Sequence, residues 1–327
     1  MAIDSFVRLR RLRRTPALRA LVQETVLNPS QLIQPMFVAE GGNARRPLAA
    51  IPGTDLLSGD AIDDEAKRIA DVGLKSVLLF GVLGSERKDP LASSSSEPNN
   101  PVCYAIDRIK TCQPEIAIIA DLCLCEYTSH GHCGVLENGR ISNDLTLNQL
   151  GMAAVNLARA GADVIAPSGV MDGVVLTLRK FLDSAGYQNV ALMPYSAKFA
   201  SCFYGPFKSA SQSVPSESQH STHQISIGNQ REALRKIEID VQEGADMVIV
   251  KPALTSLDIL ALAKENQCSV PLAGYDVSGF YSMIMNACDG DTAKSDAMIL
   301  EILTIIRRAG AQMIITYHAK QVASILR

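Results

Sequence analysis

Short apolar runs alternate with longer amphipathic segments along the chain from about residue 34 onwards. The runs are rich in β-branched residues and do not alternate between apolar and polar positions. This pattern is typical of strands buried on both faces of a parallel sheet. Eight runs are predicted as strands on this basis: 34–39, 76–82, 116–124, 163–169, 191–197, 246–252, 269–277 and 312–319.

The segments between these runs have the apolar spacing of helices. The clearest are 63–74, 146–162, 230–245 and 295–311, and each has a glycine near its expected C-terminal end: Gly73, Gly161, Gly244 and Gly310. Repeated strand–helix units predict an α/β fold, namely a (β/α)8 TIM barrel over residues 31–327. An open doubly wound sheet shares the alternation, but no Gly-x-Gly-x-x-Gly motif follows the first run, which argues against a dinucleotide-binding version.

Three segments fall outside this alternation. Residues 1–30 combine an arginine cluster with several leucines, which favours an N-terminal arm that packs on another subunit over a solvated tail. The polar stretches 93–100 and 209–226 have no period and are predicted as lids or disordered loops. The second follows a strand at the end where barrel active sites lie, so we expect a lid over about 207–226.

Charge and composition exclude several classes of protein. The 327 residues carry 31 Lys and Arg against 34 Asp and Glu, and phosphate contacts need an excess of cations, so no nucleic-acid partner is expected. No apolar run reaches the roughly 18 residues of a membrane span, so no membrane association is expected either. The chain opens without a signal-like stretch, which predicts a cytoplasmic protein whose eight cysteines are thiols.

Three of these cysteines, Cys123, Cys125 and Cys133, crowd together at and after the end of the third predicted strand. Residues two apart on a strand point to the same face, and a His-Gly-His loop allows Cys133 to return toward the other two. Three thiolates suit Zn²⁺, and three protein ligands leave a coordination position open, as in catalytic sites. His130 and His132 are alternative ligands, and the alternative to a metal site is chance crowding of core cysteines, which the tight spacing and the polar neighbours disfavour.

Two lysines, Lys198 and Lys251, end neighbouring predicted strands. Lys251 closes an apolar run, so burial is expected to lower its pKa below the reference of about 10.4 and free a neutral amine for attack on carbonyls. Lys198 would lower that pKa further by like-charge repulsion. The alternative is a pair of lysines that extend their charged ends to solvent at the sheet edge.

Other polar residues at strand ends would converge with the lysines on one mouth of the barrel. They are Asp121, Ser168, Asp172, Tyr195, Tyr275, Asp276, Ser278, Tyr317 and His318.

These residues lie in stretches that resemble the porphobilinogen synthase (5-aminolevulinate dehydratase) family. The stretches are DLCLCEYTSHGHCGVL (121–136), IAPSGVMDG (165–173), YSAKFASCFYGPF (195–207), VKPA (250–253), YDVSGFY (275–281) and ITYHA (315–319). Residues 8–25 also resemble the family's N-terminal arm, so the resemblance covers nearly the whole chain. It implies a (β/α)8 barrel, a hydro-lyase that condenses two 5-aminolevulinate molecules to porphobilinogen in haem synthesis, and a homo-octamer or hexamer formed through the arm.

The resemblance also implies roles for single residues. Lys251 would form the Schiff base with the first substrate, and Lys198 would engage the second. The remaining implied contacts are the zinc ligands Cys123, Cys125 and Cys133, the first substrate's amine contacts Asp121 and Ser168, its carboxylate contacts Ser278 and Tyr317, and the lid residue Gln224.

The chain departs from the family pattern at five positions. Lys208 and His220 stand where the family usually has arginines that clamp the second substrate's carboxylate, and neither reproduces a bidentate fork. Asp276 and Phe280 replace an amide and a carboxylate. Lys236 replaces the Glu that contacts an allosteric Mg²⁺, so a Mg²⁺ site is doubtful and the lysine's charge is expected to take the ion's place.

Three hypotheses follow for function. The first is a zinc-dependent porphobilinogen synthase. The second is a diverged paralogue that uses the same lysine and zinc chemistry on another aminoketone, which the altered clamp would suit. The third is a catalytically silent barrel, against which the retention of both lysines and all three cysteines argues.

Overall fold

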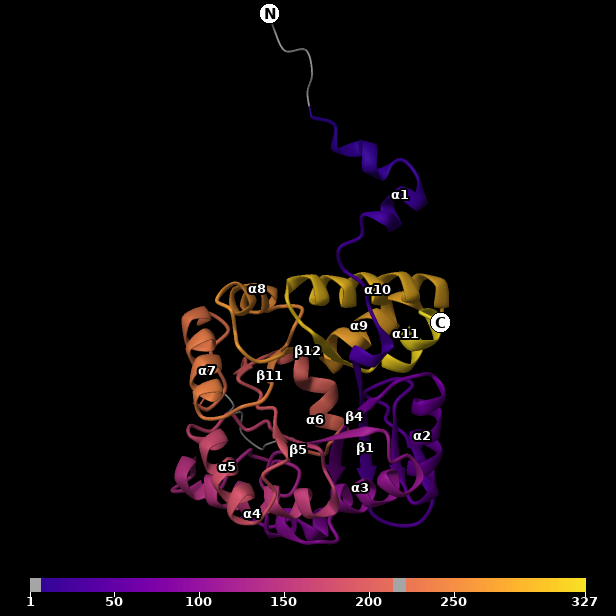
Figure 1. Cartoon of the computed structure of the whole chain (residues 1–327). Coiled ribbons are helices and arrows are strands. Elements are labelled where there is room, and N and C mark those ends of the chain that lie inside the picture. Colours follow the sequence, from indigo (N-terminus) through magenta and orange to yellow (C-terminus); the bar gives the residue numbers. More distant parts are fainter. Residues whose placement is uncertain (1–6, 214–221) are drawn as a thin grey trace, which may run out of the picture.

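Parallel strands form a closed ring at the centre of the molecule (Figure 1). The computed structural model describes residues 7–213 and 222–327. Neighbouring strands follow the order β10–β11–β12–β13–β1–β4–β5–β8–β9. Their bounds are β1 (Leu32–Ala39), β4 (Ser76–Val82), β5 (Ala117–Leu122), β8 (Val164–Pro167), β9 (Ala191–Leu192), β10 (Ala197–Lys198), β11 (Val248–Lys251), β12 (Leu272–Asp276) and β13 (Met313–Thr316).

The ring closes through β9 and β10, which are two halves of one predicted strand. Between them, the Met193 and Tyr195 N–H groups donate to Ile165 and Pro167 on the β8 side, at 2.9 and 3.1 Å. On the other side the Ile249 N–H of β11 donates to the Pro194 carbonyl at 2.9 Å. The barrel is therefore confirmed, and the open doubly wound sheet is wrong.

Helices surround the ring of strands (Figure 1). The four helices expected from the sequence are all present, within a few residues of their predicted bounds, and the glycines that follow them have positive φ. The helices are α2 (Asp60–Asp71), α3 (Pro101–Cys112), α4 (Asn143–Ala160), α5 (Val174–Ser184), α6 (Gly205–Ala210), α7 (Gln230–Gln242), α8 (Leu257–Glu265), α9 (Ser278–Cys288), α10 (Thr292–Ala309) and α11 (Ala319–Ile325).

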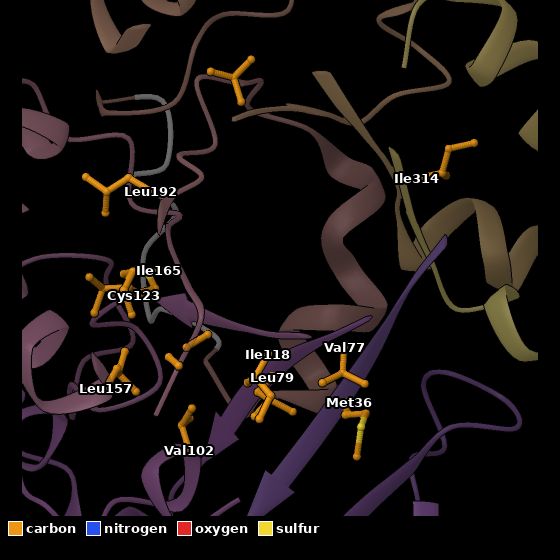
Figure 2. Packing of buried hydrophobic residues seen from close by; sticks show 14 of the residues in the cluster. Met36, Val77, Leu79, Val102, Ile118, Cys123, Leu157, Ile165, Leu192 and Ile314 are labelled. Atoms are coloured by element: carbon orange, nitrogen blue, oxygen red, sulfur yellow. The ribbon is translucent and has the colours of Figure 1, made fainter. Parts of the chain in front are cut away.

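Apolar side chains fill two layers, because successive residues of a strand point to opposite sides of the sheet. One layer lies between strands and helices; Figure 2 shows Val77 and Leu79 of β4 with Val102 of α3 and Leu157 of α4. The other fills the barrel with larger rings, among them Phe37. Every residue of β1 is buried, so the absence of alternation did indicate strands covered on both faces.

Several short strands and helices lie outside the strands and helices of the barrel. An antiparallel pair, β2 (Ala44–Pro47) and β3 (Asp55–Ser58), joins the sheet beside β1, and β6 (Leu136–Glu137) pairs with β7 (Arg140–Ile141). The polar stretch 93–100 is neither a lid nor disordered: Ser93–Ser96 form a 3-10 helix, and Gln149 of α4 donates to the Ser95 and Ser96 hydroxyls at 3.0 Å. The Ser94 hydroxyl donates to the Arg87 carbonyl at 2.8 Å, so the hydroxyls of three of these serines are hydrogen-bonded, which explains a polar segment without a period.

The segment before β1 extends away from the barrel and contains the 3-10 helix Leu9–Arg13 and the short helix α1 (Pro16–Leu21) (Figure 1). Its apolar side chains are open to solvent, with Leu9 and Leu21 exposed by 73% and 80%. In the described part of the chain, no helix combines the length and the apolarity needed to cross a bilayer.

Candidate active site

The two lysines lie side by side inside the barrel mouth. Lys198 of β10 and Lys251 of β11 are register partners across a parallel pair, and their side chains are only 7% and 4% exposed. Both follow a helix-facing strand residue, Ala197 or Val250, so both lysines point into the barrel and neither extends to solvent at a sheet edge. The alternative interpretation, in which both lysines extend their charged ends to solvent, is therefore wrong.

Aromatic rings surround the amine of Lys251. Its Nζ lies 4.1 Å from the ring centre of Tyr275 and about 5 Å from those of Tyr195, Tyr204 and Phe207. Burial among these rings, with the nearby Lys198 charge as the second cause, lowers the pKa of Lys251 to about 7. A substantial fraction of this lysine is therefore a neutral, nucleophilic amine near neutral pH.

A hydrogen-bonded chain holds the second lysine. The Lys198 ammonium donates to the Ser168 carbonyl at 2.5 Å, and the Ser168 hydroxyl donates to the Asp121 carboxylate at 3.0 Å. Burial, and then the charge of Cys123, raises the pKa of Asp121 to about 7, while both lysines oppose this rise. Asp121 and Lys198 thus both bond to Ser168, and Asp121 provides a nearby carboxyl group that can give or accept a proton.

The three crowded cysteines form a buried cluster beside this chain. The sulfur atoms of Cys123, Cys125 and Cys133 lie within 4.8 Å of one another. Hydrogen bonds from Cys123 and Cys125 hold the pKa of Cys133 well below its ordinary value, so a thiolate forms readily. Among the described residues the candidate metal group consists of these cysteines, and His130 and His132 do not join it. The donor set fits a soft metal ion.

Other predicted residues lie around the lysines. The Ser278 hydroxyl accepts from the Phe207 N–H at 3.0 Å, and the Tyr317 hydroxyl lies 3.4 Å from that of Tyr275. Gln224 is buried beside Lys198, since the next residue, Ile225, donates its N–H to the Lys198 carbonyl at 3.0 Å. Lys208 is half-buried, and burial lowers its pKa. The charge of Cys133 opposes this shift, so Lys208 lies near the cysteines.

Several other residues singled out from the sequence lie away from the lysines or outside the described part of the chain. Asp172 is exposed and exchanges hydrogen bonds with Asn143. Asp276 faces away from Lys251, because it follows the inward Tyr275, and it accepts from the Thr316 hydroxyl at 2.8 Å. Phe280 packs on Phe203, with ring centres 4.4 Å apart. His220 lies outside the described residues, as do the other residues of 214–221 in the predicted lid.

Comparison with known proteins identifies the family. Residues 6–325 match the family model described as delta-aminolevulinic acid dehydratase. The chain is 44% identical to the delta-aminolevulinic acid dehydratase of Bacillus subtilis over 98% of both chains, and 46% identical to that of Synechococcus elongatus over 97% of both. The chain belongs to the delta-aminolevulinic acid dehydratase family.

A solved structure of this family has the same fold. It is the delta-aminolevulinic acid dehydratase (porphobilinogen synthase) from Toxoplasma gondii in complex with the reaction product porphobilinogen. It superimposes with a TM-score of 0.95 and 39% identity, over 98% of this chain and 92% of that one. The resemblance noted from short motifs therefore extends to the whole barrel.

Sequence reasoning assigned no role to the aromatic residues around Lys251. Tyr275 and Tyr195 stand at inward positions of strands that flank the lysine, and Phe207 comes from α6. Strand parity was the available signal, because Tyr275 has the same parity as the inward Ala273. No comparable signal existed for Phe207, whose place depends on the turn that precedes α6.

The pKa of Lys251 gives a testable pH dependence for this member of the dehydratase family. Only the neutral amine attacks a ketone, so we expect the rate of borohydride-trapped adduct formation on Lys251 to rise with pH through about 7. The variant Lys198→Met removes a like charge and should move this midpoint upward by roughly one pH unit. Mass spectrometry of the trapped peptide measures both profiles, and the exposed-site control Lys264→Met should leave the midpoint unchanged. An unchanged midpoint in Lys198→Met would refute the charge coupling.

Proposed function

We propose that the chain is a hydro-lyase that condenses two molecules of 5-aminolevulinate to porphobilinogen in haem synthesis. One observation carries the proposal: two buried lysines in register, one with a lowered pKa, adjoin a cluster of three thiols. A lone reactive lysine would suit many carbonyl substrates, whereas two lysines beside a metal-binding cluster suit the joining of two carbonyl compounds. The family relation and the fold support this substrate class.

The covalent step follows from the state of Lys251. Its neutral amine attacks the ketone carbon of the first substrate, and the carbonyl oxygen gains protons and leaves as water, so that an imine remains. The buried Asp121, whose pKa is about 7 and whose charge acts on Lys251, would supply or take up one of these protons. The aromatic walls around Lys251 keep bulk water from the imine.

The remaining site residues have proposed roles in holding the two substrates. Ser278 and Tyr317 would bind the first carboxylate through their hydroxyl groups, which contact Phe207 and Tyr275, two of the residues around Lys251. Lys198 engages the carbonyl group of the second molecule, and Gln224 and Lys208 lie on that side of the site. Zn²⁺ held by Cys123, Cys125 and Cys133 would act as a Lewis acid toward a substrate oxygen.

A diverged paralogue remains the second candidate, and Lys208 is the observation that favours it. A lysine supplies a point charge where the family pattern has a forked guanidinium group, so the second pocket suits a different or a more weakly held carboxylate. We retain the synthase as the main proposal because the lysines, the cysteines and Asp121 are assembled as that reaction requires.

Regulation and assembly are also part of the proposal. Lys236 of α7 forms an ion pair with the buried Asp240 one turn along the helix, so the ammonium already neutralises the carboxylate there and we propose no Mg²⁺ at this position. The exposed leucines of the arm support a homo-oligomer, an octamer or hexamer, in which the arm packs on another subunit. The cytoplasmic location, the domain limits and the lid stay predictions from the sequence.

The main proposal is tested by product and adduct together. Purified protein incubated with 5-aminolevulinate should release a pyrrole, detected with an aldehyde colour reagent, and borohydride should fix the substrate's mass on Lys251. The variant Lys251→Met should lose at least on the order of a thousandfold in turnover, because it removes the nucleophile. Protein that forms neither pyrrole nor adduct on either lysine would refute the mechanism, while an adduct on Lys198 alone would reverse the two roles.

The metal proposal is tested by composition as well as by activity. We expect about one Zn²⁺ per chain and its loss in Cys125→Ala, because two thiolates no longer hold the ion firmly. The exposed thiol of Cys202 lies outside the cluster, so Cys202→Ala is a matched control that should keep both metal and activity. Elemental analysis decides, and full activity in metal-free protein would exclude a catalytic zinc.

Restoring the two arginines of the family pattern should strengthen binding of the second substrate's carboxylate. Lys208→Arg, alone and with His220→Arg, should lower the KM for 5-aminolevulinate by on the order of tenfold, because a bidentate charged hydrogen bond replaces a single contact. Adduct formation on Lys251 should not change, since other residues hold the first molecule. If the parent forms the adduct without any pyrrole, and the repaired variants do the same, the paralogue should replace the synthase as the main proposal.

A further inference from the structure

Lys88 is a half-buried cation at the barrel mouth that the proposed reaction leaves without a role. It follows the 3-10 helix Ser85–Arg87 on the loop that leaves the C-terminal end of β4. Its ammonium donates to the Gln212 carbonyl at 2.9 Å, across 124 positions of sequence. Gln212 has a φ of +52° and forms the turn that follows α6. The side chain thus joins the β4 loop to the end of α6.

The backbone next to Lys88 is fastened to the loop that carries the cysteines. Asp89 and Thr128 form a parallel bridge, in which the Asp89 N–H donates to Tyr127 and the Asp89 carbonyl accepts from Ser129, at 3.3 and 3.1 Å. The Pro90 carbonyl lies 3.3 Å from Nε2 of His130. A displacement of the Lys88 backbone would therefore also displace the cysteine loop.

On its other side, Lys88 holds a segment that covers the reactive lysine. Phe207 of α6 places its ring 5.0 Å from the Lys251 amine, and its N–H donates to Ser278. The turn after α6 is closed by a bond from the Ser213 N–H to the Lys208 carbonyl at 3.1 Å. Lys88 therefore bonds to the turn that ends the helix carrying Phe207.

We propose that Lys88 is a positioning residue: it ties the end of α6 to the cysteine loop and so keeps Lys208 in place where the second substrate binds. This inference rests on the proposed function for its effect on catalysis. The tie itself is a property of the described residues and can be tested without substrate.

The variant Lys88→Met keeps the aliphatic stem and removes the donor, while Lys88→Arg restores a cationic donor. In Lys88→Met we expect the KM for 5-aminolevulinate to rise on the order of tenfold, since a charge-assisted bond is lost. Turnover at saturation should stay within about twofold, because the segment that Lys88 positions would bind the substrate and the transition state equally well. Lys88→Arg should restore most of the affinity, and Lys67→Met, which removes an exposed charge from α2, should have no effect.

Amide hydrogen exchange without substrate provides the independent measurement. The N–H groups of Ser211 and Ser213 are bonded within the turn after α6, and their exchange should accelerate on the order of tenfold in Lys88→Met but not in Lys67→Met. Metal content and the borohydride adduct on Lys251 should not change. Unaltered exchange, or a fall in turnover with an unaltered KM, would overturn the inference. If the parent itself makes no pyrrole, the proposed function fails, yet the exchange result still decides whether Lys88 ties the two segments.

Discussion

Two positive charges placed side by side in a nonpolar interior define the constraint on which this site depends. Lys198 and Lys251 are register partners inside the barrel, so both cannot be fully charged without a large electrostatic penalty. The surroundings resolve the conflict unequally. Lys198 donates a hydrogen bond to the Ser168 carbonyl, whereas Lys251 lies among aromatic rings and has a pKa lowered to about 7. The difference in environment gives Lys251 the lowered pKa of a nucleophile, although the two residue types are identical.

The same constraint gives the neighbouring groups their chemistry. Asp121 lies within reach of the charges of both lysines and of Cys123, so its proton affinity reflects all three. In the cysteine cluster, Cys133 has a lowered pKa, to which the charge of Lys198 contributes, and a metal ion bound there would favour the thiolate further. Barrel closure is what brings these groups together, because they come from strands that are far apart in sequence but meet at one end of the ring.

Most of the fold was readable from the sequence, because buried parallel strands leave apolar runs and helices leave a 3.6-residue spacing. Closure was not readable, since it depends on the bonds of Met193 and Pro194 between the two halves of one strand. In the site, the sequence correctly predicted that the three cysteines lie close together and that the two lysines are neighbours. The prediction that Asp276 lies at the mouth was wrong, because it considered the residue type and not the strand parity. Asp276 points to the opposite side of the strand from Tyr275 and accepts from Thr316. Lys88 escaped notice because a loop lysine carries no pattern.

Strand parity also limits how this chain can vary. Lys251 faces the interior only because an even number of steps separates it from the inward Ile249. Deleting one residue within β11 would turn the lysine into the layer between strands and helices, and would bring a helix-facing valine to its place. Loops at either end of the barrel can gain or lose residues without this penalty. Related chains should therefore differ in length at their loops and keep the spacing within the strands that carry the lysines.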